Sequence, residues 1–226
     1  MKQILDIMES ARKNNKKALS EYDSKQVISA YGIPVVGETL VDDLSGAQRA
    51  ARDLAYPVVL KVCSEEITHK TEKGLIKLDL RNDGDMEEAF NLLKDRCSGD
   101  VDKFLVQKMI KGERELVIGM NRDEQFGPCV MFGLGGIFTE ILEDVSFRVA
   151  PISEQDAFEM MEEIRGHKIL GAIRGLKEVD KKMMVNSLIA LGTIGLEHEA
   201  IQGIDVNPLV ITDGKPIAVD ALVTFR

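Results

Sequence analysis

The side chains best suited to metal chemistry lie near the end of the sequence, where Asp205, Asn207 and Asp220 flank two apolar runs. These runs surround Asp213-Gly214 and predict a β-hairpin with a two-residue turn, which fixes the register of its strands. In that register Asn207 and Asp220 face each other as a non-hydrogen-bonded pair, with Cα atoms about 4.5 Å apart. Strand alternation places Asp205 on the face of Asn207. Three oxygen donors should therefore converge.

Such a donor set suits Mg²⁺, because this cation takes oxygen ligands, keeps several waters and needs only one or two carboxylates beside the phosphates of a nucleotide. A hydrogen-bonded Asp–Asn pair that closes a strand is the alternative explanation. Pro208 falls at a hydrogen-bonded position and has no backbone donor. We therefore expect the ladder to fray or bulge beside Asn207.

A lysine within an apolar strand pattern is the candidate for phosphate contact. Lys61 lies within Val58–Val62, whose other members are apolar. Burying an ammonium is costly unless an anion pairs with it, and a nucleotide phosphate is one such anion. The alternative is a lysine on an edge strand, whose stem lies on the sheet and whose head reaches water.

The loop that follows, Cys63–Gly74, carries His69 among acidic and basic residues, a composition that fits a mobile phosphate cover. A neutral imidazole can attack phosphorus, and a carboxylate from Glu65 or Glu66 on its other nitrogen would fix the tautomer. An exposed histidine without a role is the alternative. Farther along, the glycine-rich segment Gly133–Gly136 has neither the dinucleotide-binding nor the Walker spacing. It permits close backbone approach to a phosphate or another subunit, and tight packing explains it equally well.

The elements that must position these residues alternate along the chain, which predicts an α+β (α/β) protein. Capping-box patterns at Ser20–Asp23 and Ser153–Asp156 mark two helix starts. We expect an N-terminal helix in residues 1–19, one α+β subdomain in residues 20–106 and a second in residues 107–226. The expected strands before the hairpin are Val35–Leu40, Pro57–Val62, Leu75–Leu80, Lys103–Met109, Glu113–Met120 and Pro128–Phe132.

Composition excludes several classes of function. The 226 residues include 29 Lys and Arg against 38 Asp and Glu, and the formal charge of −9 argues against binding to nucleic acid or anionic membranes. No apolar stretch reaches the roughly 20 residues of a membrane-spanning helix, and the first residues do not resemble a secretory signal. The 3 cysteines contain no close pair, which favours a reducing cytoplasm.

Several motifs occur in a fixed order, and the order is more specific than any one motif. They are Lys61, the His69 loop, Gly112–Gly119, Phe132–Gly136, Val145–Pro151 and Asp205–Leu209. With these motifs the chain resembles, over nearly its whole length, the ATP-grasp β subunit of ADP-forming acetyl-CoA synthetase. The β subunit of succinyl-CoA synthetase is a more distant likeness.

The resemblance implies an ATP-grasp fold, with a nucleotide (ATP or ADP) held between two α+β subdomains. It implies that Lys61 contacts the phosphates and that adenine and ribose lie at Gln107, Met109, Ile110 and Glu115. Asn207 and Asp220 match the positions that bind Mg²⁺.

The resemblance also implies the reaction. An acyl-CoA and phosphate give an acyl phosphate on a CoA-binding α subunit, whose histidine is phosphorylated. His69 matches the β-subunit histidine that relays the phosphoryl group to ADP, so that acid, CoA and ATP form reversibly. No CoA-binding fold fits in the remaining residues, so we expect a partner chain in a heterotetramer-like assembly, with Gly133–Gly136 as a candidate contact.

Two segments depart from the pattern of this family. They are Glu72–Leu75, where Gly-Gly is common, and His167–Gly171, where Tyr-Arg is more usual. Two other functions remain open at this point. One is a stand-alone ATP-dependent carboxylate ligase of the same fold, in which His69 is dispensable. The other is a non-catalytic nucleotide-binding subunit.

Overall fold

The computed structural model describes residues 2–64, 74–97, 103–112, 114–136 and 144–226. Contacts between residues divide the chain into two compact units. Unit 1 comprises Met1–Leu19, Asp23–Val35 and Lys111–Arg226, and unit 2 comprises Ser20–Tyr22 and Val36–Ile110. The expected division grouped residues 20–106 together. The segment Asp23–Val35 instead packs with unit 1, because its apolar side chains, such as Val27 and Ile28, lie in the core of that unit.

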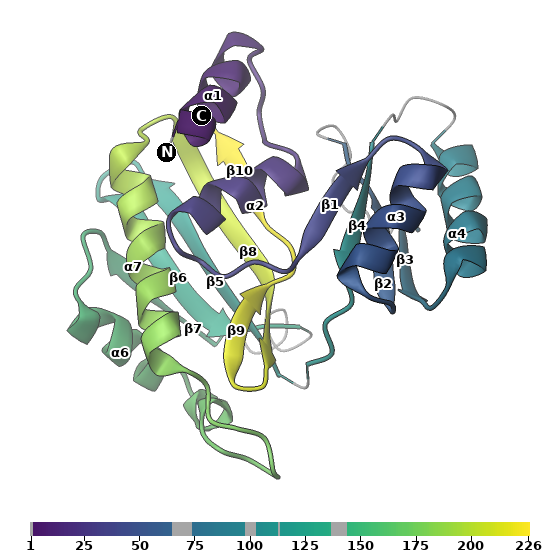
Figure 1. Cartoon of the computed structure of the whole chain (residues 1–226). Helices are drawn as coiled ribbons and strands as arrows, with labels where there is room; N and C mark the ends of the chain where they lie inside the picture. The colour runs from purple at the N-terminus through teal and green to yellow at the C-terminus, as the bar shows by residue number, and fades with distance from the viewer. Residues whose placement is uncertain (1, 65–73, 98–102, 113, 137–143) are drawn as a thin grey trace. The chain divides into compact units, whose positions relative to one another are not determined.

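Unit 2 is a four-stranded antiparallel sheet with two helices against it (Figure 1). Its strands, in sheet order, are β1 (Glu38–Val41), β4 (Phe104–Lys108), β2 (Val58–Val62) and β3 (Ile76–Leu80). Its helices are α3 (Leu44–Leu54) and α4 (Asp83–Arg96). Strand β2 lies inside the sheet, and all five of its residues are buried, as its nearly continuous apolar pattern predicts.

Both helices of unit 2 begin at a residue that caps them. The side chain of Asp43 accepts a hydrogen bond from the Gly46 backbone, and that of Asn82 accepts one from the Asp85 backbone. These bonds satisfy backbone donors that have no partner inside the helix.

Unit 1 contains a larger antiparallel sheet in the order β10, β8, β5, β6 and β7, with β9 paired to the far part of β8. The strands are β5 (Arg114–Asp123), β6 (Gly127–Leu134), β7 (Val145–Val149), β8 (Ile201–Thr212), β9 (Lys215–Ala218) and β10 (Leu222–Phe225). The helices are α1 (Lys2–Lys13), α2 (Glu21–Ala30), α6 (Glu154–Glu163) and α7 (Lys181–Glu197), with a short 3₁₀ helix at His167–Leu170. The first two residues of α2 belong to unit 2 and the rest of the helix to unit 1.

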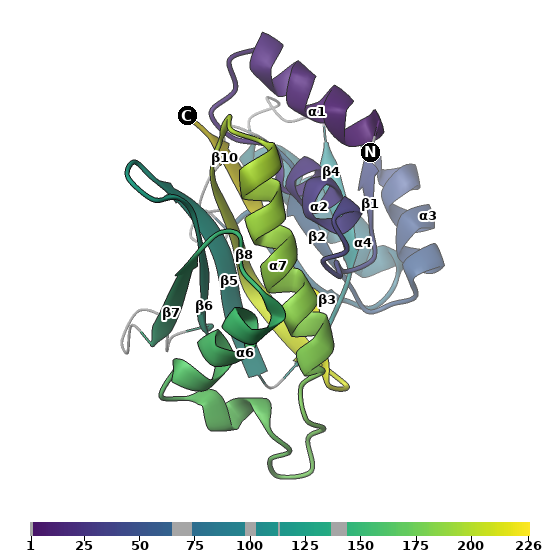
Figure 2. The ribbon, with the colours of Figure 1, turned by 90° about the vertical axis from the view of Figure 1, so that its left-hand side faces the viewer.

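The helices α2 and α7 lie against one face of this sheet (Figures 1 and 2). The buried cluster of unit 1 joins Val27 and Ile28 of α2 to the apolar side chains of α7 and of the central strands. The predicted capping box at the start of α6 is confirmed, because Ser153 and Asp156 each accept a hydrogen bond from the other's backbone N–H. Among the described residues, no helix is both long and apolar enough to cross a membrane.

The outer edge of β10 is covered by the chain that leads into α2. The backbone of Leu19 donates to the carbonyl of Val223, and the backbone of Phe225 donates to the carbonyl of Lys17. These bonds occupy backbone groups that an edge strand would otherwise expose.

The aromatic packing of unit 2 supports a stability prediction. Phe104 is 1% exposed, and its ring centroid lies 4.5 Å from that of Phe90. Phe104→Ala should lower the free energy of unfolding by about 3–5 kcal/mol, because it leaves a cavity in the core. Denaturant unfolding measures this loss. The control is Phe126→Ala at an exposed turn, which should change it by less than about 0.5 kcal/mol. Equal losses in both variants would contradict the assignment of Phe104 to the core.

Candidate functional site

The C-terminal hairpin has the predicted register. Strands β8 and β9 pair Thr212 with Lys215, and the ladder continues to Leu209 opposite Ala218. Asp213, the first residue of the turn, has a φ of 52°, in the left-handed region that such a turn requires. The turn chemistry therefore predicted the strand pairing correctly.

The ladder stops at Pro208, also as predicted. Val219 donates its backbone N–H to the Pro208 carbonyl at 3.1 Å, but Pro208 has no N–H with which to complete the pair. Beyond the interruption β8 pairs with β10 in the same register, so that Asp205 is opposite Leu222. The prediction that Asn207 and Asp220 form a ladder pair needs correction. Both residues lie in the interruption between the two ladders.

The carboxylates of Asp205 and Asp220 interact, although the ladder does not pair them. Surrounding protein raises the pKa of Asp205 by removing water from its carboxylate, and the negative charge of Asp220 raises it further. Asp220 uses one carboxylate oxygen to accept a bond from the backbone of Ala221. Two like charges in proximity favour a bound cation.

The donor chemistry fits a hard cation such as Mg²⁺. Within the described part of the chain, no group of three or more His, Cys, Asp or Glu side chains is arranged to hold a metal. Two carboxylates and the amide of Asn207 are a smaller set, suited to an ion that keeps water and phosphate ligands. The assignment of Asp205, Asn207 and Asp220 to a cation stays a prediction.

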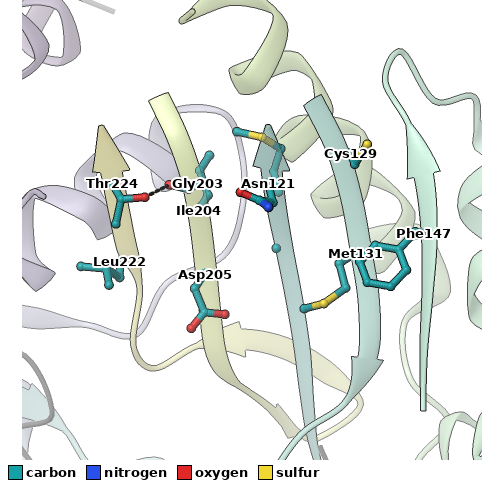
Figure 3. Close-up of a pocket in the computed structure, with 11 residues that line it drawn as sticks. Asn121, Cys129, Met131, Phe147, Gly203, Ile204, Asp205, Leu222 and Thr224 are labelled. Atoms are coloured by element: carbon teal, nitrogen blue, oxygen red, sulfur yellow. Dashed lines mark hydrogen bonds between the residues drawn. The ribbon is translucent and has the colours of Figure 1, made fainter. Parts of the chain in front are cut away.

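A shallow pocket of about 250 Å³ adjoins Asp205 on the sheet of unit 1 (Figure 3). Five residues form one continuous row across the strands of the sheet. In order from β10 to β7, they are Leu222, Asp205, Gly119, Met131 and Phe147. Strand alternation puts this row on the face opposite the buried core side chains.

Glycine leaves the centre of that row open. A Cβ atom at position 119 would lie 2.8 Å from the carbonyl oxygen of Ile204, so no larger residue fits without a shift of the backbone. Among the described residues that line the pocket, Asp205 is the only acidic or basic one. An occupant of the pocket would therefore adjoin the predicted cation site and apolar side chains together.

The structure contradicts the edge-strand explanation for Lys61. Strand β2 lies between β4 and β3, and the side chain of Lys61 is 5% exposed. Its ammonium lies 2.7 Å from a carboxylate oxygen of Glu21, whose side chain is 3% exposed. The predicted need for an anion is thus met inside unit 2 by Glu21. Sequence reasoning missed this residue, because the capping-box pattern that contains it indicated only the start of a helix.

The predicted base and ribose contacts lie in both units. Gln107 is buried in β4, opposite Val59, and the half-buried Met109 donates its backbone N–H to Pro57. Ile110, also half-buried, is the last residue of unit 2.

Glu115 is exposed on β5 of unit 1 and lies beside the glycine-rich segment. Its carbonyl accepts a bond from Gly135 at 2.8 Å, and a Cβ at Gly135 would lie 2.7 Å from its carbonyl carbon. Close packing against β5 therefore accounts for Gly135, whereas a phosphate or subunit contact stays a prediction. His69 and most of its loop lie outside the described residues.

Comparisons with known proteins agree on one class. A family model described as an ATP-grasp domain matches residues 10–225. The chain is 39% identical over 221 residues to the β subunit of acetate–CoA ligase (ADP-forming) I from Pyrococcus furiosus. The matched region covers 96% of this chain and 95% of that protein.

Solved structures of acetyl-coenzyme A synthetase 1 (dinucleotide forming) from Candidatus Korarchaeum cryptofilum are also similar. The complex with coenzyme A and Ca-AMPCP matches with a TM-score of 0.93 and 39% identity, over 98% of this chain and 99% of the other. The complex with coenzyme A and Mg-AMPPCP matches with a TM-score of 0.87 and 40% identity, over 99% and 100% of the two chains.

The mixed helices and antiparallel sheets, matched by the family model over nearly the whole chain, define an ATP-grasp protein. Within that class, the chain belongs to the family of β subunits of ADP-forming acetate–CoA ligases. The resemblance inferred from the order of motifs is thereby confirmed.

The charge at Asp205 supports a prediction about stability. In metal-free buffer at neutral pH, Asp205→Asn should raise the melting temperature by up to about 2 °C, because it removes a charge that has lost part of its water and that Asp220 repels. Because the folded pKa is raised, the penalty grows as the pH rises above the ordinary Asp pKa, where the unfolded chain ionises first, and it is complete above the folded pKa. The gain should therefore vanish below the ordinary Asp pKa of about 4, where the wild-type carboxyl is protonated in both states.

The control for this prediction is Asp213→Asn. Lys177 lowers the pKa of Asp213, so removing that charge should lower the melting temperature slightly. A lower melting temperature for Asp205→Asn in metal-free buffer would show that the carboxylates do not repel each other.

The buried pair in unit 2 supports a separate prediction. Glu21→Gln should lower the free energy of unfolding by about 3–5 kcal/mol, because it removes one charge of a buried ion pair. Adding Lys61→Met should cost less than the sum of the single changes, as denaturant unfolding of all four proteins would measure. Additive losses would show that the two side chains do not act as a pair.

Proposed function

We propose that this chain is the β subunit of an ADP-forming acetate–CoA ligase that binds ADP or ATP with Mg²⁺. In this role it passes a phosphoryl group between a CoA-binding α subunit and the nucleotide. The observation that carries the proposal is the 39% identity to a β subunit of that name over 96% of the chain. The related structure with coenzyme A and Mg-AMPPCP supports the same nucleotide and cation.

Asp205, Asn207 and Asp220 would hold the cation through two carboxylates and one amide oxygen. When bound, Mg²⁺ neutralises the charge of the phosphates to which it binds. The raised pKa of Asp205 supports this role, since the site is short of positive charge.

Lys61 would contact the nucleotide phosphates, and Gln107, Met109, Ile110 and Glu115 would contact adenine and ribose. The ammonium of Lys61 is already held by Glu21, so its position is set before a phosphate arrives. Phosphoryl transfer asks a protein mainly for such positioning and for neutralisation of charge.

His69 would relay the phosphoryl group. Its neutral imidazole nitrogen attacks the phosphorus of the α-subunit phosphohistidine, and the α-subunit imidazole leaves with the electron pair of the broken N–P bond. A terminal oxygen of ADP then attacks the phosphorus on His69, and the second N–P bond breaks. The products are ATP and two free imidazoles, so atoms and charge balance.

The proposed assembly is a heterotetramer-like complex with the CoA-binding α subunit. We place it in a reducing cytoplasm, a setting supported by its cysteines, since none of Cys63, Cys97 and Cys129 forms a disulfide in the described part of the chain.

The decisive experiment mixes the chain with a CoA-binding α subunit, acetyl-CoA, phosphate and Mg-ADP. ATP should form, and acid-labile phosphate should map to the peptide with His69. His69→Asn should lower the rate of ATP formation by at least about 1,000-fold, because the relay nucleophile is lost, while calorimetry shows unchanged binding of Mg-ADP.

The α subunit alone is the control for background ATP formation. Full activity of His69→Asn would remove the relay from the proposal. ATP-dependent activation of an acid by the isolated chain would favour the stand-alone ligase. Nucleotide binding without turnover, even with the α subunit present, would favour the non-catalytic subunit.

A further inference from the structure

A lysine is buried in unit 1 behind the chain segment that carries Asp220. Lys25 lies on α2 and is 0% exposed, as are its neighbours Ser24 and Val27. A buried ammonium must recover, through hydrogen bonds and nearby negative charge, the hydration that it loses. Packing alone does not explain a lysine at this position.

Lys25 holds the residue that precedes Asp220. Its ammonium donates a hydrogen bond to the carbonyl of Val219 at 3.3 Å. The N–H of Val219 donates in the opposite direction, to the carbonyl of Pro208. Both backbone groups of Val219 are therefore engaged, and the chain enters Asp220 from a fixed point.

The neighbouring residue of α2 holds the other side of the segment. Ser24 accepts a hydrogen bond from the backbone of Val223 at 3.1 Å in the core. Asp220 lies between these two attachments, where neither β9 nor β10 provides a ladder. Two consecutive side chains of one helix thus attach the chain on either side of Asp220.

We infer that Lys25 is a positioning residue for the cation. Through the Val219 carbonyl it fixes the backbone that presents Asp220. Groups that orient metal-binding side chains have large effects on metal affinity without touching the metal. This inference rests on the proposed function, since it concerns the cation that accompanies the nucleotide.

Lys25→Met tests the inference, because methionine keeps an apolar stem of similar length and removes the donor and the charge. Titration calorimetry of the full chain with ADP, with and without Mg²⁺, separates the affinity for ADP alone from the gain in affinity that Mg²⁺ adds. We expect the gain in ADP affinity that Mg²⁺ provides to fall by about tenfold or more. The affinity for ADP without metal should stay unchanged.

Val27→Ala is the matched control, because Val27 is also buried on α2 but its side chain carries no hydrogen-bonding group with which to hold the backbone beside Asp220. It should lower the melting temperature through the loss of buried methyl groups and leave the Mg²⁺-dependent gain intact. Should Lys25→Met lack a cooperative melting transition, Ser24→Ala provides the second test. It removes the bond from Val223 at the other attachment and should reduce the gain several-fold.

Asp220→Asn distinguishes failure of this inference from failure of the proposed function. If Mg²⁺ gives the wild-type chain no gain in ADP affinity, or if that gain is kept in Asp220→Asn, both the proposed function and the role of Lys25 are overturned. A gain that is lost in Asp220→Asn but kept in Lys25→Met and Ser24→Ala would overturn the role of Lys25 alone. A loss in Val27→Ala equal to that in Lys25→Met would reduce Lys25 to a contribution to stability.

Discussion

The missing backbone donor of Pro208 is the constraint on which the candidate site depends. Because proline cannot complete its pair with Val219, the hairpin opens between two ladders that share one register. The opening releases Asp220 from the sheet and leaves its orientation to other contacts. Helix α2 attaches the chain on either side of Asp220 through Lys25 and Ser24, and from this we infer that an element far away in sequence positions the carboxylate.

Charge is distributed unequally around this opening. Burial and Asp220 both raise the pKa of Asp205, so the ionised carboxylates cost free energy when no cation is present. The buried ammonium of Lys25 is held by the carbonyl of Val219, the residue before Asp220. In unit 2 the buried charges are balanced, because the carboxylate of Glu21 forms an ion pair with the ammonium of Lys61. The proposed cation site thus contains negative charge that Asp220 and Asp205 do not balance for each other, whereas the proposed phosphate contact is an ammonium already held by a carboxylate.

Local patterns predicted much of this arrangement, and long-range packing accounts for the rest. Asp213-Gly214 and strand alternation predicted the hairpin register and its failure at Pro208, because both depend on neighbouring residues. The pairing of Glu21 with Lys61 could not be predicted, since it joins residues distant in sequence. The membership of Asp23–Val35 in unit 1 was missed for the same reason, and the short strands β7 and β10 have too few residues to show alternation.

The sheet that presents Asp205 also determines what surrounds it. Along its row, Gly119 leaves a hollow and Met131 and Phe147 supply apolar walls. Surrounding protein displaces part of the water around the Asp205 carboxylate, which raises its pKa and would strengthen its attraction for a cation. One strand register therefore decides both where this carboxylate lies and which apolar side chains lie beside it.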